Sequence, residues 1–220
     1  MQFLQKCFYS AQIKMLLALS PPTLFHKISQ LEWYKGALQR WINDRLHGSP
    51  LRALDVGCAT GYLTEYMNQK GHDVSGVDLS KNMIKKALKR ASSLDFLVAD
   101  ARNLPFENER FDLISAASVI NITPNPPEIT RELFRVCKVG GWATFLFPVE
   151  GFTDEDLLKT KRKLNLSGFS EAALIAWHKA APKKSVHEIK EILKNAGFSP
   201  CETKGFLHGM LASVSAQKDS

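Results

Sequence analysis

The sequence predicts an α/β domain in which helices cover both faces of a mostly parallel sheet. Short apolar runs alternate with amphipathic segments from residue 51 to residue 149, which is the order expected of strands joined by helical crossovers. The runs are apolar at successive positions, as in strands that are buried on both faces. With 220 residues, 45% of them hydrophobic, the chain is long enough for one sizeable core and too short for two comfortable domains.

Two helices are predicted ahead of the first strand. Residues 2–19 repeat apolar side chains at spacings of three and four, and Pro21 and Pro22 end this helix. Its apolar face consists of Leu4, Phe8, Ala11, Met15 and Ala18. A second helical pattern leads into the first strand and carries Leu31, Tyr34, Leu38, Trp41 and Ile42.

The middle of the chain alternates strand and helix patterns. Strands are predicted at 52–58, 72–80, 95–101, 111–118 and 140–149, and helices at 62–71, 80–91 and 126–138. Ser80 is placed to cap the second of these helices, whose apolar face consists of Met83, Ile84, Ala87 and Leu88. The third helix begins with two prolines in the stretch "NPPE" at 125–128, where proline in the first turn indicates a helix start.

The C-terminal third returns to helices before the sheet is completed. Residues 153–181 are rich in Ala, Leu and Lys and look helical, and the next helix is capped by Ser185 and ends at Gly197. The tail alternates as a pair of strands joined near 205–209. We therefore divide the chain into an N-terminal helical cap (1–50), a core (51–150), a helical insertion (151–184) and a last helix with the final strands (185–220).

Composition excludes several classes of protein. The four cysteines form no CxxC pair, so neither a metal site nor a disulfide framework is indicated, and a cytoplasmic location fits. No run approaches the ~18 apolar residues that a membrane-spanning helix needs. The net charge of +7 comes from the flanks, because residues 51–150 carry 12 basic and 12 acidic residues. The uneven charge makes an acidic substrate or an anionic surface worth testing.

The stretch "LDVGCATGY" at 54–62 is the first candidate site. A strand that ends in Asp55 is followed by small residues and then by a helix, which predicts a turn whose backbone approaches a ligand closely while free helix amides point at it. Gly57 and Gly61 are separated by three residues, which departs from the G-x-G-x-x-G pattern and disfavours a nicotinamide dinucleotide.

Asp78 is the second candidate. It follows the next predicted strand, 23 residues after Asp55. A carboxylate at this position can accept hydrogen bonds from both hydroxyls of a ribose. The alternative is a purely structural role, in which the carboxylate caps the helix that starts after Ser80.

Several stretches in order resemble the successive motifs of one family. They are "LDVGCATG", "VSGVDLSKNMIKKA", "FLVADARNLPFENERFDLISAASVI" and "RELFRVCKVGGWATFLFP", within residues 51–149. They resemble the class I S-adenosylmethionine-dependent methyltransferases, and most of all the small-molecule group that includes the ubiquinone/menaquinone biosynthesis methyltransferase-like proteins. The resemblance implies a Rossmann-like doubly wound, mostly parallel seven-stranded sheet with an antiparallel last strand, and S-adenosyl-L-methionine as cofactor.

The resemblance also implies a role for each matching position. The methionine portion of the cofactor would be surrounded by Asp55 and by the backbone of Gly57, Cys58, Ala59 and Gly61, and its ammonium would be bound by the backbone around Ala116 and Ala117. The adenosine portion would contact Asp78 at the ribose and Leu79, Met83, Asp100 and Ala101 at the adenine. Ala59 stands where the family usually has glycine, which is tolerated if its φ is negative. Tyr34 resembles a tyrosine that closes over the cofactor, with core packing as an equal alternative.

The catalytic residues are less well defined. In-line methyl transfer from a sulfonium depends mainly on holding the reactants in a dry site, so a dedicated base is optional. Asn121 stands where relatives often have histidine, and it could orient a substrate hydroxyl or amine or simply cap a loop. His178, His187 and His208 are weak candidates, each more often a surface or packed histidine.

Large apolar side chains in the flanking segments are predicted to line the substrate site. They are Trp33, Tyr34, Phe147, Phe152, Phe169 and Trp177, which we place outside the regular sheet and helix pattern. This lining predicts an organic, at least partly apolar substrate. We also expect a monomer or homodimer, and the neutral core disfavours a nucleic-acid partner. The alternatives are an RNA or protein methyltransferase and a non-catalytic cofactor-binding module. The N-terminal helix would cap the site or contact a membrane surface weakly, and the insertion would act as a lid.

Overall fold

The structure is a computed structural model that describes residues 9, 11–13, 15, 16 and 21–219, without the side chains of 21, 22, 25, 200 and 201. Seven strands form one sheet in the order β3-β2-β1-β4-β5-β7-β6. The strands are β1 (Arg52–Val56), β2 (Asp73–Asp78), β3 (Asp95–Val98), β4 (Phe111–Ala117), β5 (Cys137–Pro148), β6 (Ser199–Phe206) and β7 (Leu211–Gln217). Strands β1 to β5 are parallel, and β7 lies antiparallel between β5 and β6. The predicted mostly parallel, seven-stranded sheet with an antiparallel last strand is confirmed.

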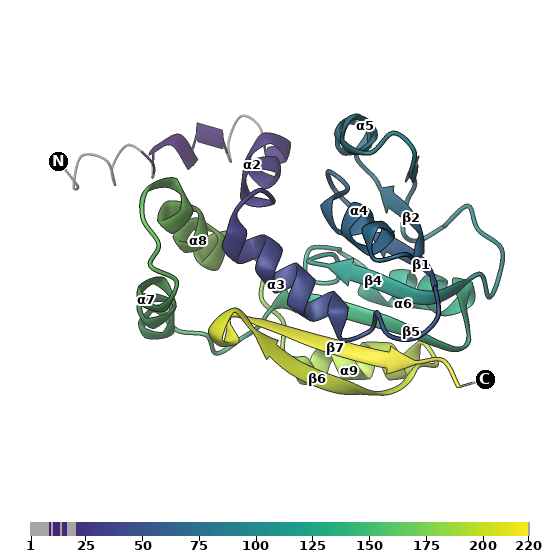
Figure 1. Ribbon diagram of the computed structural model, residues 1–220. Coiled ribbons are helices and arrows are strands. Elements are labelled where there is room, and N and C mark those ends of the chain that lie inside the picture. Colours follow the sequence, from purple (N-terminus) through teal and green to yellow (C-terminus); the bar gives the residue numbers. More distant parts are fainter. Residues whose placement is uncertain (1–8, 10, 14, 17–20, 220) are drawn as a thin grey trace.

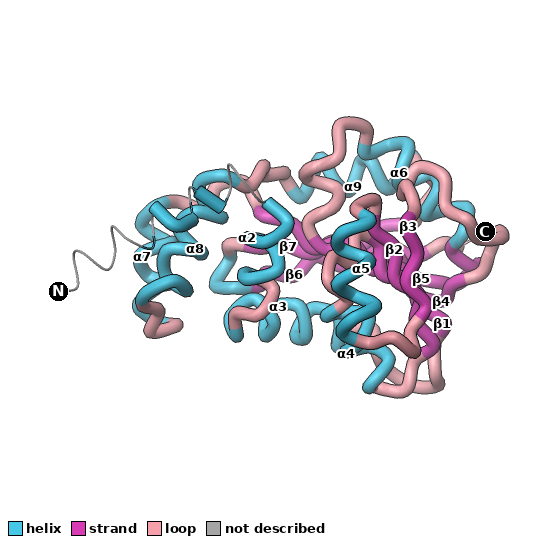
Figure 2. Tube along the Cα trace, turned by 90° about the horizontal axis from the view of Figure 1, so that it is seen from above, coloured by secondary structure: helices cyan, strands magenta, loops and turns pink. Residues whose placement is uncertain are grey.

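Helices cover both faces of this sheet. They are α2 (Pro21–Ile28), α3 (Glu32–Asn43), α4 (Tyr62–Gln69), α5 (Lys81–Arg90), α6 (Pro126–Val136), α7 (Asp154–Lys163), α8 (Gly168–Ala180) and α9 (Val186–Asn195), with a short 3-10 turn at Leu207–Gly209. Figure 2 shows α6 and α9 on one side of the strands and α3, α4 and α5 on the other. In Figure 1, α7 and α8 extend beyond the sheet next to α2. No helix in the described part of the chain is both long and apolar enough to span a bilayer.

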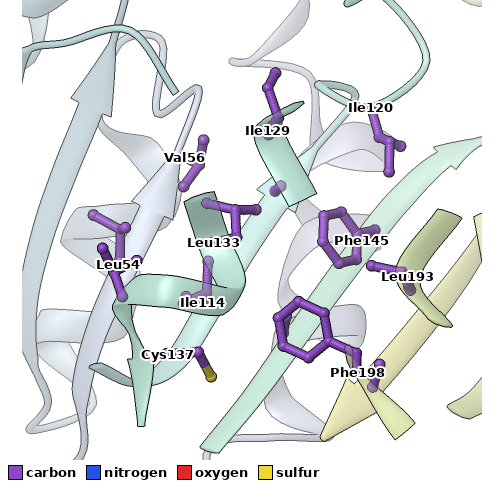
Figure 3. Packing of buried hydrophobic residues seen from close by; sticks show 14 of the residues in the cluster. Leu54, Val56, Ile114, Ile120, Ile129, Leu133, Cys137, Phe145, Leu193 and Phe198 are labelled. Carbon is purple, nitrogen blue, oxygen red and sulfur yellow. The ribbon is translucent and has the colours of Figure 1, made fainter. Parts of the chain in front are cut away.

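Alternation along the strands creates two separate cores. On β1, Leu54 and Val56 point toward α6 and α9, where they join the larger cluster of buried side chains seen in Figure 3. Ala53 points to the opposite face and packs in a second cluster with side chains of α3, α4 and α8. Because both faces are buried, every position of the strand except its first must be apolar or internally hydrogen-bonded, which explains the continuous apolar pattern.

The helix starts follow the local sequence signals. The hydroxyls of Ser80 and Ser185 accept hydrogen bonds from the amides of Met83 and Glu188, so both predicted caps are present. Helix α6 begins with Pro126 and Pro127, as predicted for the stretch at 125–128. Helix α7 has a full capping box between Thr153 and Asp156.

Three details of the predicted helices are wrong. Leu88 was placed on the buried face of α5, yet it is 41% exposed, because the buried stripe ends with Met83, Ile84 and Ala87. The helix predicted to reach residue 138 ends at Val136, and β5 starts at once at Cys137.

The third error concerns the N-terminal helix. Met15 is 55% exposed and Ala11 is exposed, whereas Ile13 is buried and Leu16 packs beside it. The face that contacts the domain is therefore not the predicted one. The other members of the predicted apolar face, Leu4, Phe8 and Ala18, lie outside the described residues.

Candidate functional site

Three adjoining cavities lie where β1, β2 and β4 end. We call them the strand-end cavity (about 370 Å³), the central cavity (about 300 Å³) and the apolar chamber (about 140 Å³). Gly57, Asp78, Val119 and Ile122 line both the strand-end and the central cavity. Ile28, Ser118, Ile122 and Trp177 line both the central cavity and the apolar chamber. Shared walls make one continuous site, in the crevice where open α/β sheets bind ligands.

The glycines of the loop at 57–61 are required by the protein itself. Gly57 and Gly61 have φ values of +69° and +77°, in the left-handed region that favours glycine. A Cβ at Gly57 would lie 2.4 Å from Val119 Cγ2, and one at Gly61 would lie 2.6 Å from Phe96 Cζ. The sequence reasoning attributed the small side chains to a ligand alone. Gly57 does line two cavities, but Gly61 is small because Phe96 packs against it.

Asp78 ties the glycine loop to the end of β2. Its Oδ2 accepts a hydrogen bond from the Ala59 amide at 3.0 Å, and its Oδ1 accepts from the Ser80 amide at 2.8 Å. Each carboxylate oxygen can accept a second hydrogen bond, so the group can hold the loop and bind a ligand together. Asp78 also lines both larger cavities. The same carboxylate can therefore have the structural role and the ribose-binding role that were given above as alternatives.

Asp55 lies beneath the loop and is 2% exposed. Its carboxylate accepts hydrogen bonds from Thr64 Oγ1 at 2.8 Å and Ser115 Oγ at 3.2 Å. Burial raises the pKa of Asp55 to about 7, with a smaller contribution from the charge of Asp78, and the two hydroxyls oppose the shift. Asp55 is absent from the described walls of the three cavities, so its effect on a ligand there would be electrostatic rather than a direct contact.

Ala59 does not have the negative φ that an alanine was expected to need at this position. Its φ is +48°, so the backbone is left-handed at this position, where the sequence analysis required a negative φ. A non-glycine residue in this conformation costs roughly 1–2 kcal/mol. The strain persists because the Ala59 amide is held by Asp78.

Replacing Ala59 by glycine is expected to stabilise the loop. The Ala59→Gly variant should keep the hydrogen bond to Asp78 and lose the left-handed strain, which raises the free energy of unfolding by roughly 1 kcal/mol. The greater freedom of glycine in the unfolded chain offsets part of this gain. Urea unfolding of both proteins measures the difference. The matched control is Ala176→Gly in the middle of α8, which should destabilise by a similar amount. A destabilised Ala59→Gly protein would contradict the strain.

Four further predicted cofactor residues line the two larger cavities. Leu79, Asp100 and Ala101 line the strand-end cavity and Met83 lines the central cavity, so the structure brings all four to the site. Leu79 is 72% exposed, unusual for a large apolar side chain. Asp100 forms a two-pronged ion pair with Arg102, whose hydrogen bonds hold the pKa of Asp100 below its usual value.

Two predicted cofactor contacts involve backbone groups, and both stay predictions. The Cys58 amide donates to Val77 O and is not free for a ligand, whereas its carbonyl accepts from the Gly61 amide and can accept once more. The Cys58 side chain packs with Ile84, Ala87 and Phe96. Ala116 is buried in the core on the α6 side, whereas its neighbour Ala117 lines the central cavity.

Aromatic side chains of α3 and α8 form one wall of the central cavity. Trp177 stacks on Trp33 with ring centroids 5.7 Å apart and meets Tyr34 edge-on at 5.4 Å. Trp33 is held by a hydrogen bond from its Nε1 to Ser170 Oγ. Tyr34 and Trp177 line the cavity, and burial raises the pKa of Tyr34 to about 12, so this phenol stays neutral.

The other predicted aromatic residues do not line the three described cavities. Phe147 belongs to β5 and is fully buried in the core, because alternation along the strand turns it away from the cavities. Trp33, Phe169 and Trp177 lie in helices of the two flanking segments, as the helical patterns there predict. Phe152 packs on His178, and neither Phe152 nor Phe169 is among the cavity residues.

The two weak catalytic candidates, Asn121 and His178, differ in whether they line one of the three described cavities. Asn121 is 4% exposed and lines the apolar chamber. Its Nδ2 donates to Pro182 O at 3.0 Å, and its Oδ1 is buried with no hydrogen-bond partner among the described residues. His178 is absent from the three described walls, and its Nε2 lies 3.3 Å from Asp154 Oδ1. His187 and His208 are exposed.

Sequence reasoning missed the segment that follows β4. Ser118, Val119 and Ile122 line two or more cavities, and Ile122 is 61% exposed. The run "SVINIT" offered a signal, because two isoleucines follow a strand end without a strand of their own. Ser118 has a φ of +56°, which turns the chain sharply away from the sheet and over the cavities.

Comparisons with known proteins match the core of this chain to methyltransferases. Residues 54–145 match the model of a family described as "Methyltransferase domain". The chain is 36% identical over 92 residues to a malonyl-[acyl-carrier protein] O-methyltransferase of Hamiltonella defensa, covering 42% of this chain and 36% of the relative. It is 32% identical over 110 residues to a ubiquinone biosynthesis O-methyltransferase of Pseudomonas fluorescens, covering 48% and 47%. The matches thus span less than half the length of these relatives.

A solved structure extends the likeness to the whole fold. The chain superimposes on a SAM-dependent methyltransferase from Aquifex aeolicus with a TM-score of 0.69 and 16% sequence identity, over 90% of this chain and 98% of the other. Together with the family match, this confirms the resemblance to class I methyltransferases that residues 51–149 indicated.

Proposed function

We propose that this chain, which contains a class I methyltransferase domain, is an S-adenosylmethionine-dependent methyltransferase that acts on a small, partly apolar molecule. The observation that carries the proposal is Asp78, which holds the glycine loop and lines both the strand-end and the central cavity. A nucleoside with a charged tail has the same two-part shape as these cavities. The apolar chamber beyond them is then left for the methyl acceptor.

The residues present fit the cofactor. The ribose hydroxyls would donate to the carboxylate oxygens of Asp78, and the adenine would lie in the strand-end cavity beside Leu79, Asp100 and Ala101. The methionine portion would lie in the central cavity near Gly57 and Ala117. When bound, the cofactor supplies a sulfonium methyl group. A positive charge there is favoured by the carboxylates of Asp55 and Asp78.

The chain contributes positioning and exclusion of water to the reaction. Tyr34 and Trp177 line the central cavity, and Trp177 also lines the apolar chamber. The acceptor would receive the methyl group that the bound cofactor supplies, and the proton that the acceptor loses would go to water. Holding acceptor and methyl carbon in line in a dry site supplies most of the rate enhancement that such transfers need.

The proposal includes a cytoplasmic location, no nucleic-acid partner and weak peripheral contact with a membrane surface at most. Two buried free thiols, Cys58 and Cys137, support a reducing compartment. The substrates in the names of the relatives, a carrier-bound malonyl group and a ubiquinone precursor, belong to those proteins. The roles of the cofactor residues and of the 151–184 insertion as a lid are part of the proposal.

The function is tested by turnover. The protein is incubated with S-adenosylmethionine and a metabolite extract, and mass spectrometry follows S-adenosylhomocysteine and products heavier by one methyl group. We expect both to accumulate together. Cofactor binding without any turnover across extracts would favour a non-catalytic module, and methyl transfer to bulk RNA or protein instead would favour the other alternative.

A further inference from the structure

The apolar chamber carries a chemical signature of its own. Its wall is made of apolar and small side chains apart from Ser118 and Asn121, namely Leu24, Ile28, Ile122, Ala176, Trp177, Ala180, Ala181 and Pro182. Its volume of about 140 Å³ is close to the 150 Å³ of an engineered apolar cavity that binds benzene. The chamber therefore has the size and surface to take one six-membered ring.

The amide of Asn121 has a fixed orientation in this wall. Its hydrogen bond reaches the carbonyl oxygen of Pro182, which can only accept, so the nitrogen must be the atom on that side. The oxygen is then the atom without a partner, and it is buried. A buried acceptor without a donor costs free energy, and a ligand that enters the chamber can supply the donor.

The charges of the described wall residues also restrict which functional group the ligand can carry. None of the described residues that line the chamber or the central cavity is Lys, Arg or His, and Asp78 is the one acidic residue of the two walls. A carboxylate on the acceptor would therefore meet no cation among the described residues of these walls, and it would face the Asn121 oxygen, which is also an acceptor. A neutral hydroxyl or amine has no such penalty.

From this we infer that the apolar chamber binds a ring of the methyl acceptor that bears a neutral hydroxyl or amine, donated to Asn121 Oδ1. The inference rests on the proposed function and adds the substrate class to it: a phenol-like or aniline-like group, not a carboxylate. Asn121 acts as a positioning residue. A side-chain amide is not a base, so the proton lost during transfer goes to water.

Four monosubstituted benzenes test the inference without requiring turnover. Phenol, aniline, toluene and benzoate are titrated into the protein saturated with S-adenosylhomocysteine, and binding is followed by ligand-observed NMR. We expect phenol and aniline to bind about tenfold more tightly than benzoate, and at least as tightly as toluene although their polar groups must leave water. Tightest binding by benzoate, or by toluene alone, would overturn the inference.

The variant Asn121→Leu separates the hydrogen bond from a structural effect. It removes the acceptor at similar volume, so phenol and aniline should lose about tenfold in affinity relative to toluene. A purely structural role of Asn121 would weaken all the probes in the same proportion and would sink the inference. Ala180→Ser is the matched control, since it adds a hydroxyl to the same wall and leaves Asn121 in place. If Asn121→Leu fails to fold, the probe ranking in the natural protein decides alone.

The outcomes also distinguish this inference from the proposed function. Turnover of S-adenosylmethionine with equal binding of phenol, toluene and benzoate would remove the inference and leave the function. If the probes rank as expected but the protein never forms S-adenosylhomocysteine from S-adenosylmethionine, the inference about the chamber stands and the proposed function is wrong.

Discussion

Replacing Asp78 by alanine is expected to weaken S-adenosylmethionine binding by about 100-fold. The change removes two acceptors for ribose hydroxyls, and charge-assisted hydrogen bonds of this kind contribute ~1.5–3 kcal/mol each. It also releases the amides of Ala59 and Ser80, so the glycine loop loses one of its hydrogen bonds to β2 and keeps the one from the Cys58 amide to Val77 O. Both effects act on the same cavity walls, and titration calorimetry measures their sum.

Asp73 provides the matched control for this change. It lies at the opposite end of the same strand, is largely exposed and, among the described residues, forms an ion pair with Arg52 alone, at 3.4 Å. Asp73→Ala should therefore bind the cofactor as the natural protein does. If Asp78→Ala keeps full affinity, or if Asp73→Ala loses as much, Asp78 does not bind the ribose.

The fold could be predicted because its signals are local. The Ser80 and Ser185 caps, the prolines of α6 and the apolar strands all act within a few residues, and the structure has each of them. The errors have a different origin. Leu88 has the right helical spacing, but which face of α5 is buried depends on how the helix packs against β2 and β3, and this tertiary packing cannot be read from the spacing alone.

The candidate site was predictable where it depends on backbone position. Asp78 and Gly57 follow strand ends, so topology alone brings them together. The position of Phe147 could not be read from its apolar character, because a shift of one residue along β5 turns a side chain from one face to the other. The wall formed by Ile28 and Trp177 depends on contacts between α2 and α8, which are about 150 residues apart in sequence.

Ala59 illustrates the same limit at the level of one residue. The sequence shows an alanine among glycines, but the sign of its φ is decided by the hydrogen bond to Asp78, 19 residues away. Local propensity would favour a negative φ. The tertiary hydrogen bond overrides that preference, so the strained conformation appears only once the loop and β2 are placed together.

The stability of the unliganded protein is expected to fall as pH rises from about 4 to 7 because of Asp55. In the unfolded chain this carboxyl titrates near 3.8, whereas in the folded protein burial raises its pKa to about 7. Between these values the folded state holds a proton that the unfolded state has lost, so each step up in pH favours unfolding. The free energy of unfolding should decrease by about 4 kcal/mol across this window and by no more above it.

The comparison with Asp55→Asn isolates this contribution. The amide does not ionise, so the difference in free energy of unfolding between the two proteins, measured in urea from pH 4 to pH 8, should favour the variant increasingly up to about pH 7. Thr64→Val is the directional control. It removes the hydrogen bond that opposes the shift, so it should move the upper end of the window to higher pH. A constant difference at all pH values would show that Asp55 is ionised throughout.

The same carboxyl then couples cofactor binding to pH. A sulfonium and an ammonium near Asp55 favour its ionised form, so binding should release a proton below about pH 7, and affinity should rise as pH increases to that value. Calorimetry at pH 6.5 in two buffers of different ionisation enthalpy measures the proton directly. The natural protein should release a fraction of one proton per cofactor bound, and Asp55→Asn should release less. Equal release from both proteins would place the positive charges of the cofactor away from Asp55.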